Sequence, residues 1–217
     1  MQQSAFKKHF TKPKKGSTVD LKWLGVPEKH PIFAGYAVKG LPLLGGLQYP
    51  GVTRICSVSG CIRGGAVKAK PWDVNRLSLY DNPGDSWATV PEDECGNYEL
   101  LAFDIYPEIF RLGSVCKLGV PVVTPCPLSP SAQFLGFDYA TYEATSWTSA
   151  GVEAYGAGCS PLSCNERANE ISVNPYCLLD CFETAMEEAW KTSASGGTLG
   201  EPGDYAVYGV YAVPVPD

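Results

Sequence analysis

The sequence has no long hydrophobic run, and this absence bears on where the protein works. Its best apolar run, residues 118–123, is short and is interrupted by Pro121, whereas a membrane-spanning helix needs about 20 consecutive apolar residues. The first fifteen residues also lack the apolar stretch of a cleavable signal peptide. We therefore expect a soluble, cytoplasmic protein.

Histidine is scarce as well, with only His9 and His30 in 217 residues. Catalysis by a serine or cysteine nucleophile ordinarily uses a histidine base. The chain also lacks a phosphate-binding loop, a dinucleotide fingerprint, a zinc-protease helix motif and a Gly-x-Ser-x-Gly elbow. No catalytic constellation is therefore recognisable, and no cofactor is predicted.

Basic residues are few beyond residue 15, so the net charge of −6 hides an asymmetry. A basic arm, residues 1–16, carries +5, and a single domain, residues 17–217, carries −11. An acidic domain repels phosphate, so only the arm has the charge to contact nucleic acid. The lysines of the arm, which we predict to bind a partner, are Lys7, Lys8, Lys12, Lys14 and Lys15.

The arm has two possible interpretations. Phe6 and Phe10 are four residues apart and flank Lys8 and His9, which is compatible with one amphipathic turn that docks on an acidic or membrane surface. The alternative is a solvated, frayed terminus that keeps the protein soluble.

Glycine and proline are abundant, with 23 and 18 residues, and they divide the chain into short segments. Runs of aliphatic residues, Thr and Tyr between Gly, Pro, Asn and Asp clusters are typical of strands. We interpret residues 112–130 as an extended wrapping segment rather than a linker, because of their apolar content. Residues 81–85 are predicted to form a surface turn. The predicted strands are residues 32–39, 52–58, 75–80, 98–105, 134–145 and 205–213.

The one long helix predicted covers residues 181–192. Phe182, Ala185, Met186, Ala189 and Trp190 follow the spacing of a helix with one apolar face. Asp180 and Glu183 form a plausible capping pair at its start. The predicted fold class is therefore α+β: short strands and long Pro/Gly-rich loops, with this main amphipathic helix near the C-terminus packed on a mostly antiparallel sheet.

Nine cysteines make the chain cysteine-rich. An odd count without a signal peptide favours reduced thiols, although four disulfides with one free thiol are also possible. Local pairs such as Cys56 and Cys61 are spaced somewhat widely for a structural metal site, so we expect ordinary packed thiols and predict no metal ligands.

The segment 156–166 is the most distinctive stretch. Ser160 and Pro161 can begin a helical turn, and Ser163 and Glu166 can form a capping box. A thiol at such a helix start has a lowered pKa, which makes Cys159 and Cys164 weak catalytic candidates with His30 as base. The alternative is a tight loop in which both cysteines face the core.

Two charged features stand apart from this segment. Asp104 lies on an otherwise apolar predicted strand, where we expect Arg111 or a backbone turn before Pro107 to be its partner. A basic cluster within residues 60–70 suits either an anion site or, preferably, the lysine-guarded edge of a hairpin.

The sequence favours a non-enzymatic interaction or assembly module whose basic arm docks on an acidic partner, either another protein or a second copy. Seventeen Tyr and Trp residues suit contact surfaces as well as cores. One alternative is a thiol-dependent enzyme that uses Cys159 or Cys164 with His30. A further alternative is a module stabilised by a cysteine-bound metal.

Overall fold

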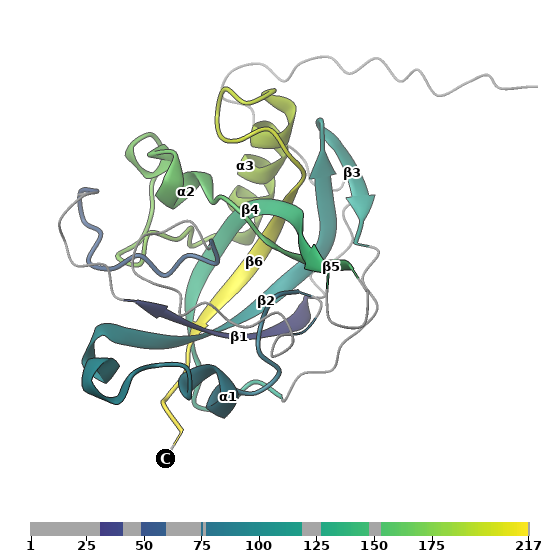
Figure 1. The fold of residues 1–217 in the computed structure, drawn as a ribbon. Helices are drawn as coiled ribbons and strands as arrows, with labels where there is room; N and C mark the ends of the chain where they lie inside the picture. The colour runs from purple at the N-terminus through teal and green to yellow at the C-terminus, as the bar shows by residue number, and fades with distance from the viewer. Residues whose placement is uncertain are drawn as a thin grey trace, which may run out of the picture.

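A computed structural model describes residues 31–40, 49–59, 75, 77–118, 127–147 and 153–216. The basic arm, His30 and the basic cluster within residues 60–70 lie outside these residues. Figure 1 shows a twisted sheet of long strands, with helix α3 near one end of the sheet and helix α1 near the other. Among the described residues, no helix is both long and apolar enough to cross a membrane.

Within the described residues the sheet has six strands, and their pairings are all antiparallel. The order of strands is β1-β2-β6-β4-β5, and β3 pairs with β2. The strands are β1 Ile32–Gly40, β2 Tyr98–Arg111, β3 Ser114–Lys117, β4 Gln133–Trp147, β5 Glu153–Ala157 and β6 Tyr205–Ala212. The prediction of an α+β fold dominated by antiparallel strands is confirmed.

The central strand β6 explains the uncharged tyrosine- and valine-rich sequence of its segment. It lies between β2 and β4, and every residue from 205 to 210 is buried. A strand enclosed by neighbours and covered on both faces has no solvated side that would call for alternating polar residues. Tyr205 and Tyr208 therefore contribute to the core, whereas Tyr211 near the end of the strand is half-buried.

The longest helix of the described part, α3, spans Phe182–Ala194 and packs on β2, β4 and β6. Its buried side includes Phe182, Met186 and Trp190. The predicted capping pair is wrong: Cys181 occupies the N-cap, its side chain makes no capping hydrogen bond, and its thiol donates to Glu183 instead. The Asp180 carboxylate instead accepts a hydrogen bond from Asn174 at 2.9 Å.

Two predicted strands are wrong. Residues 52–58 are irregular, because the backbone N–H groups of Thr53 and Arg54 donate to the carbonyl of Pro175 instead of joining the sheet. The described residues within 75–80 form a turn around Asn75, whose side-chain oxygen accepts the N–H groups of Leu77 and Leu79. Local side-chain bonds of this kind compete with strand pairing.

Four short helical turns complete the described fold. They are α1 Pro83–Trp87, η1 Glu92–Asn97, α2 Pro161–Cys164 and η2 Arg167–Asn169. The predicted surface turn at 81–85 is therefore the start of α1. Asn82 caps this helix by accepting the N–H of Asp85 at 2.8 Å, and proline occupies the first position.

Candidate functional site

A fully buried carboxylate organises the segment that the sequence singles out. Asp138 lies on β4 and is 0% exposed. Its carboxylate accepts the hydroxyls of Ser57 and Ser160, each at 2.6 Å, and the N–H groups of Val58 and Tyr139. Burial raises the pKa of Asp138, and these four hydrogen bonds oppose the rise. Asp138 thus joins β4 to two loops.

This carboxylate also explains why the predicted helix start differs from expectation. Ser160 is the N-cap of α2, but its hydroxyl makes no cap hydrogen bond because it donates to Asp138. Glu166 does not form the predicted capping box with Ser163. Its backbone adopts the left-handed conformation, and it is the N-cap of η2. The two turns are held by tertiary contacts rather than by local caps.

The candidate thiols flank the turn that Ser160 ties to Asp138, but their surroundings differ. Cys159 is buried, and its Sγ lies 3.1 Å from Oδ1 of Asn165. Cys164 is half-buried, with its Sγ 3.4 Å from the hydroxyl of Ser59 and 3.8 Å from that of Ser163. The proposed base, His30, lies outside the described residues, so this part of the thiol hypothesis stays a prediction.

Two further thiols are packed in the interior. Burial raises the pKa of Cys56 and of Cys177 to about 12, with the negative charge of Glu99 adding to the rise at Cys56. Seven cysteines fall within the described residues, and all seven are free thiols. The same part of the chain contains no group of three or more His, Cys, Asp or Glu residues arranged to hold a metal ion.

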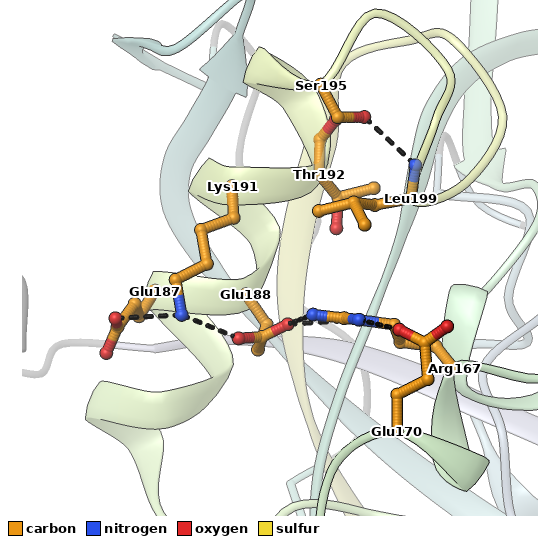
Figure 2. Close-up of polar contacts among 8 residues, drawn as sticks. All are labelled: Arg167, Glu170, Glu187, Glu188, Lys191, Thr192, Ser195 and Leu199. Atoms are coloured by element: carbon orange, nitrogen blue, oxygen red, sulfur yellow. Dashed lines mark hydrogen bonds and ion pairs between the residues drawn. The ribbon is translucent and has the colours of Figure 1, made fainter. Parts of the chain in front are cut away.

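A second polar cluster joins α3 to the turn η2, and Figure 2 shows it. Glu188 is 4% exposed and accepts Nη2 of Arg167 at 2.8 Å and Nζ of Lys191 at 2.9 Å. Arg167 also pairs with Glu170, and Lys191 pairs with Glu187. Each charged group has a partner of opposite charge, so we interpret this cluster as an ion-pair network that holds α3 against η2.

Asp104 has a different partner from the one predicted. Its Oδ2 accepts the hydroxyl of Tyr211 at 2.7 Å, while Arg111 pairs with Asp204 at the far end of β2. Asp104 is 8% exposed. Within the described residues its Oδ1 accepts no hydrogen bond, and no cationic side chain pairs with it. Burial raises its pKa, and the bond from Tyr211 opposes this rise.

The surroundings of Asp104 are aromatic. In the strand register it lies opposite Gly209, which lies opposite Phe137. Phe134 and Tyr211 also lie opposite each other, with ring centroids 5.2 Å apart. Phe134 is 44% exposed, which is unusual for a ring of this size. We call Asp104, Gly209, Phe134, Phe137 and Tyr211 the Asp104 face.

The absent side chain of Gly209 shapes this face. A Cβ built there would lie 3.5 Å from the Cβ of Asp104, 3.6 Å from Tyr211 and 3.7 Å from Phe134. Three side chains therefore gather around a position that has only a hydrogen atom. Sequence reasoning identifies Asp104 as unusual but misses its companions, because they come from β4 and β6; strand alternation alone does not give the register between them.

The Asp104 face lies between two packed clusters on one side of the sheet. One cluster includes α3 together with Tyr106 and Val207, and the other includes Ala102 and, at its margin, Tyr211. Residues two apart on a strand share a face, so Asp104 and Gly209 lie between these clusters. The Asp104 carboxylate therefore lies near the apolar side chains of both clusters.

Comparisons with known proteins do not assign this arrangement: no family model, no curated protein and no solved structure gives a significant match to the chain.

Proposed function

We propose that this protein is a non-enzymatic assembly module in which the basic arm of one copy docks on the acidic domain of another. The observation that carries the proposal is an excess of negative charge. Within the described residues, 19 carboxylic side chains accompany only six cationic ones. The arm supplies five lysines and no acid, so the chain contains both halves of a complementary pair.

The cations of the described residues neutralise only a minority of these carboxylates. Arg54, Arg111, Arg167 and Lys191 already pair with neighbouring carboxylates, and Lys39 donates to the carbonyls of Val58 and Ser59. The remaining carboxylates leave a negative potential that attracts a lysine-rich segment and steers its approach. Charge complementarity therefore supports a second copy as the partner.

The enzymatic alternative has less support from the geometry. Asp138 is inaccessible to a substrate because it is fully buried, and both serines beside it donate to its carboxylate. A nucleophile needs an approach path and a base within hydrogen-bond reach. Cys159 is buried as well. The metal-stabilised alternative also has no support among the described residues.

Sedimentation equilibrium of the full chain tests the proposal. We expect a concentration-dependent mass above one copy that falls when residues 2–16 are deleted. A matched variant with all five arm lysines changed to glutamine keeps the length of the arm and should behave like the deletion. A full chain that stays a single copy at every concentration, or one whose assembly survives both changes, contradicts the proposal.

A further inference from the structure

The starting observation is that Asp104 is largely buried and that no cationic side chain of the described residues pairs with it. It is 8% exposed, and its only hydrogen bond within the described residues is the one from Tyr211 to Oδ2. A carboxylate removed from water is costly unless it is paired. At Asp138 four donors meet this requirement. At Asp104 the hydroxyl of Tyr211 is the one donor found within the described part of the chain, and it reaches Oδ2 alone.

The groups around Asp104 favour one kind of ligand. Phe134 presents an exposed ring beside the carboxylate, and Tyr211 adds a second ring. Aromatic faces attract cations, and the attraction grows where water is displaced. A carboxylate oxygen next to such rings suits a primary ammonium group, which offers three N–H donors and carries an apolar stem.

We propose that the Asp104 face is a receptor for a lysine ammonium group and that its occupant is a lysine of the arm. This inference rests on the proposed function and assigns the docking position within it. Two lysines of the arm lie between Phe6 and Phe10 and three follow, so one segment offers both an ammonium group for Asp104 and a ring to pack near Phe134.

The position of β1 makes the arm a suitable occupant. Phe33, the second residue of β1, lies opposite Asp104 in the strand register, so the chain that leads from the arm joins the domain beside the site. The eighteen residues from Lys15 to Phe33 extend to at most about 60 Å. That length allows an arm to reach the site of a second copy in contact with the first.

The protonation state of Asp104 should control binding, because only the carboxylate attracts an ammonium group. Two titratable groups face Asp104: Tyr211 on β6 and Tyr106 on its own strand. Burial raises the pKa of Tyr106 to about 12 and that of Tyr211 above its ordinary value. Both phenols therefore stay neutral across the working range, and affinity should rise with pH as Asp104 ionises.

A direct titration tests the inference. A fluorescently labelled peptide of residues 1–16 is titrated, with anisotropy as readout, into the chain that lacks residues 2–16. We expect saturable binding that weakens with salt. Asp104→Asn should reduce the affinity roughly tenfold or more, as for loss of a charge-assisted hydrogen bond, and Phe134→Ala roughly two- to fivefold.

Two controls separate this site from general charge attraction. Asp93→Asn removes one negative charge from the exposed turn η1 and should leave the affinity unchanged. A peptide with its five lysines changed to glutamine should not bind. Equal effects of Asp104→Asn and Asp93→Asn, or no peptide binding at all, overturn the inference. If the peptide binds through Asp104 while the full chain stays a single copy, the site stands and the assembly proposal fails.

Discussion

Tyr211 donates its hydroxyl hydrogen to Oδ2 of Asp104 over 2.7 Å, from the strand next to that of Asp104. The bond runs diagonally, since Asp104 itself lies opposite Gly209. It fixes one oxygen of the carboxylate and leaves the other for a ligand. A side chain at residue 209 would lie between these two partners.

Asp104→Asn should stabilise the free domain at neutral pH. Burial raises the pKa of Asp104 above its ordinary value of 3.8, so the folded state holds this proton more tightly than the unfolded state. Stability of the wild type therefore falls as pH rises from about 3.8 through the raised pKa, and then levels off. The variant has no titratable carboxyl group at this position, so its free energy of unfolding should not decrease for this reason as pH rises.

Urea unfolding of the arm-deleted wild type and Asp104→Asn between pH 3.5 and 8 measures this difference. The free energies of unfolding should diverge with increasing pH, with the variant the more stable. If the wild type becomes the more stable protein as pH rises, Asp104 has a compensating cation and the receptor interpretation is wrong.

Asp138→Asn should destabilise the fold strongly. The carboxylate accepts four hydrogen bonds, and an amide nitrogen would face two of those donors with hydrogens of its own. Unsatisfied buried donors cost about 1–3 kcal/mol each, so we expect a loss of about 2–4 kcal/mol. Ser160→Ala removes one donor only and should cost about 1–2 kcal/mol. A loss below about 0.5 kcal/mol for Asp138→Asn would refute the role of this carboxylate.

The cluster in Figure 2 predicts unequal effects for two adjacent glutamates. Glu188→Ala removes the buried carboxylate of this pair and leaves the half-buried Arg167 with only the exposed Glu170, so we expect a cost of about 1.5–3 kcal/mol. Glu187→Ala removes only a more exposed pair with Lys191, with an expected cost below about 1 kcal/mol. Thermal unfolding of both variants distinguishes them. Similar losses would show that Glu188 has no special role.

Thiol labelling distinguishes a reactive site from packed cysteines. Cys116 and Cys181 are exposed and should react first with iodoacetamide, whereas Cys56 and Cys177, with pKa values raised to about 12, should react last. The sites are located by mass spectrometry across a pH series. Faster labelling of Cys159 or Cys164 than of the exposed thiols would instead favour the enzymatic alternative.

Sequence reasoning succeeds where one physical requirement dominates a segment. The uncharged stretch around Tyr205 and Val210 requires burial on both faces, and β6 meets this requirement as the central strand. It fails where a tertiary contact replaces a local one. Ser160 has the residue type and position of a cap, yet the buried charge of Asp138 takes its hydroxyl, and nothing near Ser160 in the sequence indicates this.

The error at Asp104 has another cause. On one extended strand, seven residues separate Asp104 from Arg111 by about 23 Å, so pairing within the strand is geometrically impossible. The true partner, Tyr211, lies more than one hundred residues away, and only the register between β2 and β6 brings it close. Strand alternation predicts which face a residue shares, but it contains no information on which distant residue lies across from it.

A mixing experiment tests the central claim most directly, because it separates the arm from its receptor. Full-length Asp104→Asn retains the arm without the site, and the arm-deleted wild type retains the site without the arm. Native mass spectrometry should show a single copy for each protein alone and a mixed complex of one copy of each when they are combined. Absence of that mixed complex, while the unmodified full chain still assembles, would contradict docking of the arm at Asp104.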